Sequence, residues 1–248
     1  MGDYDSAVRA IAEAKRAVAF TGAGISVESG IPTFRGEDGL WSRYDPKVLD
    51  INYFFENPLE SWRVIVEIFY DYMGESARPN TAHRFLAELE KIGISRGVIT
   101  QNIDNLHQEA GSRKVVEFHG TAQRLECTVC RKKWRFTESM IEKLPPSCPD
   151  CGGLLKPDFI FFGEAIPPDA YRESLELCHD ADVMIIIGTT GEVMPASMIP
   201  FEAKDALTIE INTQRSAYTE DLTDIFLQDR ATVASKKLWD GIKECLKM

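Results

Sequence analysis

Two Cys-x-x-Cys pairs restrict the possible folds of this chain more than any other feature of its sequence. Cys127 pairs with Cys130 and Cys148 with Cys151, and residues 131–147 lie between the pairs. Each pair brings two sulfurs together on a tight turn, and two facing turns complete a tetrahedral site for Zn²⁺. Four thiolates leave the metal no open position for water or substrate. We therefore predict a structural zinc ribbon.

Disulfides, a redox pair or an iron–sulfur site are the other roles open to paired cysteines. Disulfides are disfavoured because Met1–Asp5 has neither the basic start nor the apolar stretch of a signal peptide. We expect a cytoplasmic protein. The longest apolar runs, such as Val183–Ile187, are too short to cross a bilayer, so no membrane association is expected.

Outside 124–156, apolar strand patterns alternate with helical patterns. Strands are predicted at 17–20, 97–100, 115–118, 183–187 and 207–211, and helices at 5–16, 57–73 and 81–92. The run at 183–187 lacks polar alternation, as expected of a central parallel strand covered on both faces. The pattern predicts an α/β protein: a Rossmann-like doubly wound parallel sheet with a smaller inserted domain.

The charge balance is acidic, with 28 Lys and Arg against 39 Asp and Glu and a net charge of −11. This balance argues against direct nucleic-acid binding, because phosphates would be repelled. It fits a basic partner such as a lysine-rich peptide. Acidity also aids solubility without any partner, so charge alone does not separate the two.

A glycine-rich turn, Gly22-Ala23-Gly24, follows the first predicted strand. Such turns let backbone N–H groups approach a pyrophosphate at the start of a helix. The spacing departs from G-x-G-x-x-G because the next glycine is Gly30, so a tight turn without a ligand is an alternative. The continuation favours a ligand, because Phe34 and Arg35 in a glycine-rich loop can cover a ribose and clamp a phosphate.

Polar residues also follow two other predicted strands. Gln101, Asn102 and Asp104 come directly after the strand ending at Thr100, at the end of a parallel strand where open α/β sheets bind ligands. A helix N-cap would explain Asn102 or Asp104, but not the whole set. His119 ends the strand at 115–118, where a histidine is placed for proton transfer near neutral pH.

The other three histidines are weaker candidates for such a role. His83 falls in a predicted helix, His179 in a predicted surface turn, and His107 in a segment that can face either way.

Together these segments resemble the sirtuin family. The matching stretches are GAGISVESGIPTFRG, TQNIDNLH, FHG, the two Cys-x-x-Cys pairs, KPDFIFFGE, and GTT followed by PA, in the family's order over about 5–240. The resemblance implies a Rossmann-like NAD-binding domain (1–41, 97–123 and 157–248). It also implies a helical insert with the cofactor loop (42–96) and a zinc-ribbon module (124–156).

The resemblance also implies the site residues. NAD as co-substrate is expected against Gly22, Ala23, Gly24, Ile25, Thr33, Phe34, Arg35, Trp41, Gln101, Asn102, Ile103, Asp104, Gly188, Thr189, Thr190, Asn212, Thr213, Gln214 and Ala231. His119, Asn102 and Asp104 are expected to be catalytic. An acyl-lysine peptide is expected to add as a strand between Phe162-Gly163-Glu164 and the region of Val193.

The implied reaction is NAD-dependent removal of the acyl group from a protein lysine. The amide oxygen attacks the ribose carbon as nicotinamide departs, and His119 takes a proton from a ribose hydroxyl. The products are nicotinamide, free lysine and O-acetyl-ADP-ribose. Mono-ADP-ribosyl transfer to protein uses the same pocket and is the alternative enzyme activity. A non-catalytic NAD-binding scaffold is disfavoured because it has no need of Asn102, Asp104 and His119.

Two departures from the family bear on the substrate. Glu192 and Met194 stand where relatives usually carry an apolar residue and often an aromatic one, so a negative charge lies near the expected peptide groove. It either favours basic flanking residues or only faces solvent. The Tyr-x-x-Arg pair of succinyl- and malonyl-removing subfamilies is missing, because neither Tyr70 nor Tyr72 is followed by the arginine. Neutral acyl groups such as acetyl are therefore expected.

Overall fold

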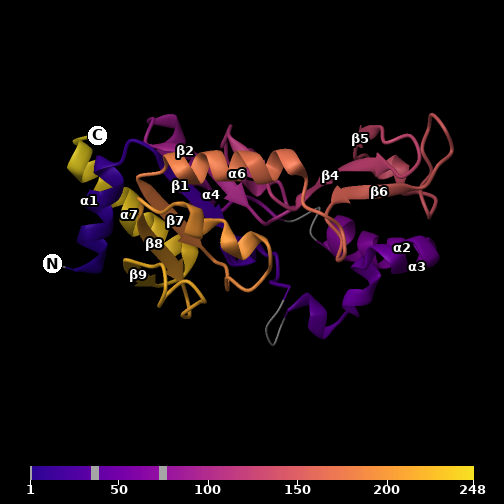
Figure 1. Cartoon of the computed structure of the whole chain (residues 1–248), viewed down its shortest axis with the longest axis horizontal. Helices are drawn as coiled ribbons and strands as arrows, with labels where there is room; N and C mark the ends of the chain where they lie inside the picture. The colour runs from indigo at the N-terminus through magenta and orange to yellow at the C-terminus, as the bar shows by residue number, and fades with distance from the viewer. Residues whose placement is uncertain (1, 35–38, 73–76) are drawn as a thin grey trace.

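The computed structural model describes residues 2–34, 39–72 and 77–248. A larger lobe holds a six-stranded parallel sheet in the order β3-β2-β1-β7-β8-β9, and a smaller lobe holds a three-stranded sheet in the order β5-β4-β6 (Figure 1). The large-sheet strands are β1 (Ala17–Thr21), β2 (Ser95–Thr100), β3 (Val115–Glu117), β7 (Val183–Ile187), β8 (Leu207–Asn212) and β9 (Ile225–Gln228). The small-sheet strands are β4 (Gly120–Cys127), β5 (Lys133–Arg135) and β6 (Leu155–Phe159).

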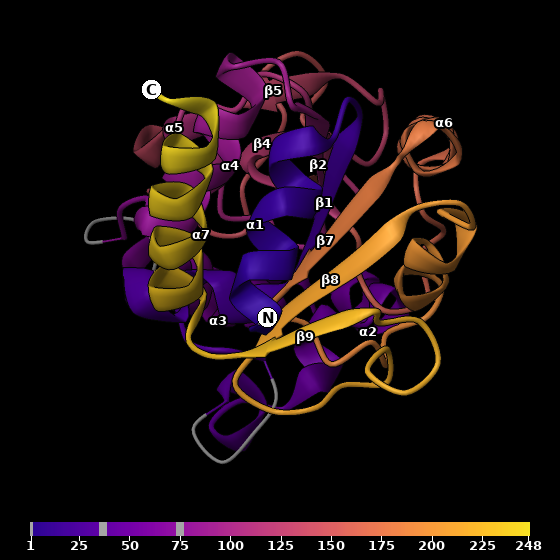
Figure 2. The ribbon, with the colours of Figure 1, turned by 90° about the vertical axis from the view of Figure 1, so that its left-hand side faces the viewer.

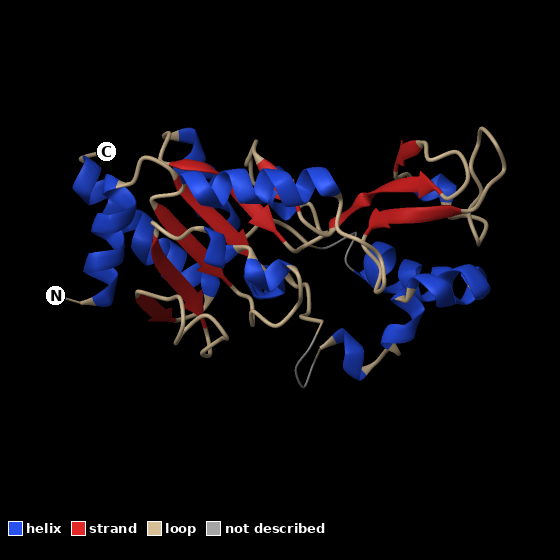
Figure 3. Cartoon of the chain, viewed as in Figure 1, coloured by secondary structure: helices blue, strands red, loops and turns tan. Residues whose placement is uncertain are grey.

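Helices connect the strands and cover the sheets (Figure 3). The α-helices are α1 (Asp3–Glu13), α2 (Ile51–Glu56), α3 (Pro58–Ile65), α4 (Thr81–Lys91), α5 (Leu106–Glu109), α6 (Pro168–Asp180) and α7 (Ala231–Leu246). Short 3₁₀ segments are η1 (Ala23–Ser29), η2 (Leu40–Ser42), η3 (Pro46–Leu49), η5 (Glu138–Met140), η6 (Ala196–Met198) and η7 (Pro200–Glu202), and η4 (Val66–Tyr72) is a π-helix. The single helix predicted at 57–73 is thus α3 continued by η4.

The strand order confirms the predicted doubly wound sheet. β1 pairs in parallel with β2 on one side and with β7 on the other, so the direction of strand addition reverses between β1 and β7. A crevice for ligands lies outside the carboxyl ends of the strands at such a reversal. The loops that follow β1, β2 and β7 therefore define where a site can form.

Alternation along β1 fixes which helices cover each face of this sheet. Ala17 and Ala19 pack in a core cluster with α1, α4 and α7, whereas Val18 and Phe20 pack in a second cluster with α6. This division follows from the two-residue period of a strand. Figure 2 shows α1 and α7 on one side of the sheet and α6 on the other. No helix among the described residues is long and apolar enough to span a membrane.

The smaller lobe has one core, shared by the zinc-ribbon region and the helices before it. The Trp62 side chain is fully buried, and its Nε1–H donates to the Leu155 carbonyl at 2.9 Å. The Tyr70 hydroxyl donates to the Ala122 carbonyl at 3.0 Å, and its ring stacks on Phe136 with centroids 4.1 Å apart. The helical insert and the ribbon therefore stabilise each other.

Helix α4 packs with the larger lobe, although it falls within the range 42–96 expected for the helical insert. Phe85, Leu86 and Leu89 form its apolar stripe and join the cluster that contains α1 and α7. Asn80 caps its N-terminus, with the side-chain oxygen accepting from the backbone N–H groups of Ala82 and His83. The stripe needs an apolar partner, which α7 supplies.

Candidate active site

The glycine turn after β1 lies against the turn after β7, at the point where the strand order reverses. An added Cβ at Gly24 would lie 2.6 Å from the Cα of Gly188, and one at Gly22 would lie 2.7 Å from the Cβ of Thr189. Both approaches are closer than side chains tolerate. The two glycines therefore allow two loops to meet at the carboxyl edge of the sheet.

The backbone N–H groups of these glycines are used inside the protein. Gly22 donates to the Ile187 carbonyl at 3.1 Å, and Gly24 donates to the Gly188 carbonyl at 2.8 Å. These two N–H groups therefore join the loops after β1 and β7 to each other. The side chain of Ile25, which the resemblance places at the cofactor, is fully buried in the core of the larger lobe.

The loop after β2 is bonded to both of these turns. Gln101 Nε2 donates to the Thr189 hydroxyl at 3.1 Å, and Asn102 Nδ2 donates to the Gly22 carbonyl at 3.1 Å. The structure thus joins the loop after β2 to the turns after β1 and β7. A cavity of about 70 Å³ adjoins this loop, with Ile103, Asp104 and residues of the helical insert in its lining.

Ser26 is the centre of this region, and sequence reasoning did not single it out. Its hydroxyl donates to Asp104 Oδ2 at 2.7 Å and accepts from Asn102 Nδ2 at 3.2 Å. His83 Nε2 lies 3.4 Å from the same oxygen. A hydroxyl has one proton and two lone pairs, so Ser26 uses all three on these partners. The directions of the hydrogen bonds are thereby fixed.

Both oxygens of the Asp104 carboxylate accept hydrogen bonds. Oδ1 accepts from the backbone N–H of Leu106 at 3.0 Å, while Oδ2 accepts from Ser26. Burial raises the pKa of Asp104, and these two hydrogen bonds oppose the rise. The side chain is thus fixed in orientation beside the cavity.

His83 and His107 lie beneath this network with ring centroids 4.9 Å apart. His83 Nδ1 accepts from the backbone N–H of Asn80 at 3.3 Å, which leaves its proton on Nε2 for Ser26. His107 Nε2 lies 2.9 Å from the Thr21 hydroxyl. Neither ring is exposed, and both are placed by hydrogen bonds within the protein. The Asn80–His83 capping spacing was the one signal that could have drawn attention to His83.

Acidification is expected to destabilise the fold through these two histidines. Burial lowers the pKa of His83 from 6.5 to about 4, and burial lowers the pKa of His107 as well. The unfolded chain then binds protons first, so the free energy of unfolding is greatest above pH 6.5 and falls as the pH drops towards 4. For His83 alone the loss is about 3 kcal/mol. Urea unfolding of the unaltered chain and of His83→Gln at pH 4–7 measures this loss.

The His83→Gln variant should have a shallower pH slope than the unaltered chain, whatever its stability at pH 7. The exposed His179 at the end of α6 supplies the matched control, His179→Gln, which should keep the original slope. Parallel slopes for all three proteins would show that His83 does not titrate as its burial indicates.

His119 follows β3 and is oriented by the loop after β2. Its Nδ1 lies 3.1 Å from the Gln101 carbonyl, and the backbone carbonyl of His119 accepts from Ile160 at 2.9 Å. A carbonyl only accepts, so the proton of the neutral ring is on Nδ1 and the lone pair is on Nε2. Burial lowers the pKa of His119, and the Gln101 bond opposes that shift. The ring is therefore uncharged at neutral pH, with the lone pair of Nε2 available.

The residues expected around an adenosine lie at the same edge, beyond β7. Asn212 ends β8 and donates from Nδ2 to the Thr189 carbonyl at 2.9 Å, and the Thr190 carbonyl accepts from Ala217 at 3.0 Å. Thr213 and Gln214 follow and are exposed, whereas Ala231 is buried as the first residue of α7.

The loop between η1 and η3 is described only in part. The Phe34 ring lies 5.6 Å from Trp41 and 6.4 Å from Phe69, centroid to centroid, so it packs against the helical insert. The Thr33 carbonyl accepts from Leu40 at 2.9 Å. Arg35, expected at the phosphates, lies outside the described residues.

The segments expected to hold a peptide lie on different lobes. Phe162 exchanges backbone hydrogen bonds with Leu49 and Ile51 of the helical insert, at 2.8 and 3.0 Å. Gly163 has φ +89°, in the left-handed region. In the larger lobe, the Val193 carbonyl accepts from Ser197 at 2.9 Å.

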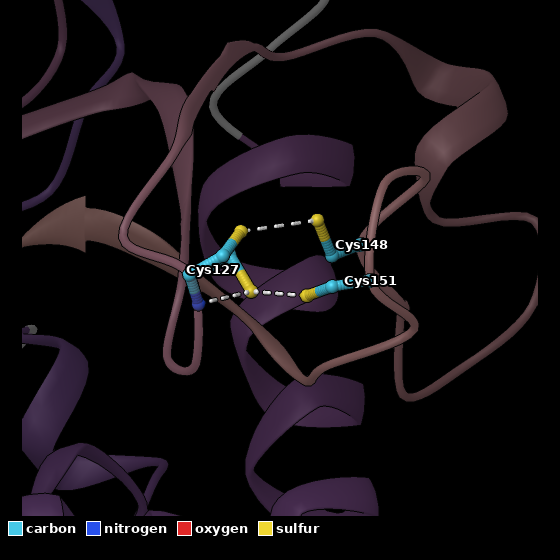
Figure 4. Close-up of side chains that lie close together, drawn as sticks. Cys127, Cys148 and Cys151 are labelled. Carbon is cyan, nitrogen blue, oxygen red and sulfur yellow. Dashed lines mark hydrogen bonds between the residues drawn. The ribbon is translucent and has the colours of Figure 1, made fainter.

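The four predicted metal ligands form one cluster. The sulfurs of Cys127, Cys130, Cys148 and Cys151 lie within 4.8 Å of one another. Figure 4 shows the side chains of Cys127, Cys148 and Cys151 in this cluster. Cys127 Sγ is 3.5 Å from Cys151 Sγ, and Cys130 Sγ is 3.8 Å from Cys148 Sγ. A tetrahedral zinc with Zn–S bonds of about 2.3 Å needs sulfurs about 3.8 Å apart. The cluster therefore fits Zn²⁺.

Comparison with known proteins identifies the family. The Sir2 family pattern matches residues 22–195. The chain belongs to the Sir2 family. It is 47% identical to an NAD-dependent protein deacylase of Aeropyrum pernix over 236 residues, which are 93% of this chain and 94% of that protein.

Solved Sir2 structures agree over nearly the whole chain. A Sir2 homologue bound to NAD superposes with a TM-score of 0.90 at 38% identity, covering 98% of this chain and 94% of that one. A Sir2 variant bound to deacetylated p53 peptide and 3′-O-acetyl-ADP-ribose has a TM-score of 0.87 at 36% identity, covering 94% and 96%. The Rossmann-like sheet with a smaller cysteine-bearing lobe is thus the fold of this family.

Proposed function

We propose that this Sir2 protein is an NAD-dependent protein lysine deacylase in which His119 is the general base. The observation that carries the proposal is the convergence of the β1, β2 and β7 loops on one edge, with the neutral His119 ring anchored to Gln101. Its relatives bear the name of this activity, and one solved homologue holds NAD. We place the reaction in the cytoplasm, where the four zinc-binding cysteines are kept reduced.

The residues of the site suit a dinucleotide. NAD supplies an electrophilic ribose carbon once nicotinamide leaves. Its phosphates and ribose would be lined by Gly22, Ala23, Gly24, Thr33, Phe34, Arg35 and Trp41. Its nicotinamide would be lined by Gln101, Asn102, Ile103 and Asp104. Its adenosine would be lined by Gly188, Thr189, Thr190, Asn212, Thr213, Gln214 and Ala231. Asp104 and Asn102 fit a carboxamide because both are oriented by Ser26.

His119 would act through Nε2. Its lone pair accepts a proton from a ribose hydroxyl, and the Gln101 carbonyl stabilises the imidazolium that forms by accepting from Nδ1–H. The same hydrogen bond keeps the ring in one orientation, so the ring need not rotate before proton transfer. Proton transfer and orientation thus come from one contact.

The peptide would lie between Phe162, Gly163 and Glu164 on one side and Val193 on the other. A neutral acyl group is favoured because the arginine that recognises acidic acyl groups in some relatives is missing after Tyr70 and Tyr72. Glu192 is exposed in the loop before Val193 and adds a negative charge near the peptide, so basic flanking residues are favoured.

Glu192→Gln is expected to reduce this preference for basic peptides. For an acetyl-lysine peptide with flanking arginines, kcat/KM should fall about two- to fivefold, the usual size of an exposed charge pair. A peptide with neutral flanks should be unaffected. Glu176→Gln is the matched control, because the Glu176 side chain is exposed on α6. Equal losses on both peptides would show that Glu192 does not read flanking charge.

The activity itself is tested by following both products. Purified protein with NAD and an acetyl-lysine peptide should release nicotinamide only when the peptide is present, in step with free lysine and O-acetyl-ADP-ribose. NAD consumption without deacetylation, with label from NAD on protein, would instead establish mono-ADP-ribosyl transfer. Binding of NAD without any turnover would leave the scaffold as the function.

A further inference from the structure

Lys156 is a buried cation that the proposed chemistry does not use. It lies on β6 with 9% of its surface exposed. An ammonium group has three donors, and an unpaired one is costly to bury. Lys156 lies in the segment that leads from the ribbon to Phe162.

All three donors of Lys156 are directed at the segment that follows it. Nζ donates to the Pro157 carbonyl at 2.9 Å, to the Phe159 carbonyl at 2.7 Å and to Glu164 Oε2 at 2.9 Å. Nζ also lies 4.4 Å from the centre of the Phe161 ring. The side chain therefore ties β6 to the turn at 161–164.

Glu164 completes this arrangement from the other end. Its Oε2 also accepts from the backbone N–H of Phe161 at 2.8 Å, and its own N–H donates to the Phe161 carbonyl at 3.0 Å. The carboxylate is thus directed into the turn and is only 24% exposed. Glu164 Oε2 is consequently occupied by Lys156 and the Phe161 N–H.

We propose that Lys156 is a positioning residue for the peptide substrate. Through Glu164 and the carbonyls of Pro157 and Phe159, it holds 162–164 in the shape that pairs with the acyl-lysine peptide. This inference rests on the proposed function, because it takes 162–164 as one wall of the peptide groove. It extends that function by assigning the shape of the wall to a side chain outside the groove.

Lys156→Met tests the role, since it keeps the stem and removes the ammonium. Its KM for an acetyl-lysine peptide should rise about tenfold, while kcat at saturating peptide and the KM for NAD stay within about twofold. A merely structural lysine would affect all three. Lys133→Met, on β5, is the matched control: that lysine pairs with Asp158 but is exposed. Zinc content and thermal unfolding confirm that the variants are folded.

Glu164→Gln supplies a second variant should Lys156→Met fail to fold. It should also raise the peptide KM, and the effect of the double variant should be smaller than the product of the two single effects, because both variants break the Lys156–Glu164 contact. Additive losses, an unchanged peptide KM, or an equal rise in the KM for NAD would overturn the proposal.

Hydrogen exchange separates this inference from the proposed function. Backbone amides of 161–164 should exchange faster in Lys156→Met than in the unaltered chain and in Lys133→Met, with no substrate needed. Unchanged exchange would overturn the inference even in an active enzyme. An unaltered chain without deacylase activity would refute the proposed function, and faster exchange would still support the hold of Lys156 on the turn.

Discussion

Replacement of Cys148 by serine is expected to abolish zinc binding and to unfold the smaller lobe. Cys127 and Cys148 are buried in the same core as Trp62, Leu125 and Leu155, so the metal and the apolar core support each other. Structural zinc contributes about 10–16 kcal/mol of apparent binding free energy in small zinc domains. This contribution is as large as the whole free energy of unfolding of most domains, or larger. Loss of the metal should therefore remove the helical insert's packing surface along with the ribbon.

Elemental analysis and circular dichroism with thermal unfolding measure this effect. The unaltered chain should hold one zinc, and Cys148→Ser should hold none and unfold at a lower temperature. Cys245→Ser is the matched control, because Cys245 is exposed and outside the cluster. A Cys148→Ser protein that keeps its unfolding temperature and its activity would show that the cluster is not a structural zinc site.

Replacement of His119 by alanine is expected to reduce kcat by about 10²- to 10⁴-fold, the usual contribution of a general base. The loss should fall on kcat, because the His119 side chain is held by the Gln101 carbonyl through Nδ1, which leaves Nε2 for proton transfer. NAD affinity should change little, since the loops after β1 and β7 are joined without the His119 ring. Single-turnover assays and calorimetric titration with NAD measure the two quantities.

The pH profile gives an independent test of the same assignment. Burial lowers the pKa of His119, so the fall in kcat/KM on acidification should lie at a lower pH than an ordinary histidine would give. His179→Ala should match the unaltered enzyme in every assay, because His179 is exposed on α6. A His119→Ala enzyme of normal kcat would assign the base elsewhere.

Local spacing determined part of this molecule from the sequence alone. The cysteine pairs predicted the four-sulfur cluster, because each pair closes its own turn and needs only one facing partner. The apolar run at 183–187 and the other short apolar runs predicted the parallel sheet. A strand and its buried faces can be recognised from the order of apolar and polar residues along a short stretch of sequence. Gln101, Asn102 and Asp104 were found because they follow a strand directly.

Contacts between distant residues were decided only by the tertiary structure. Ser26 donates a hydrogen bond to Asp104 and lies beside His83, and both partners are distant from it in the sequence. No local sequence pattern therefore identifies Ser26 as part of the site. Gly24 meets Gly188 across two loops, a close approach that the glycine spacing alone did not predict. Helix α4 was assigned by its position in the chain to the insert, yet its stripe packs on α7. Short-range spacing fixes turns and strands, whereas the partner of a buried polar group or an apolar stripe depends on which elements the fold brings together.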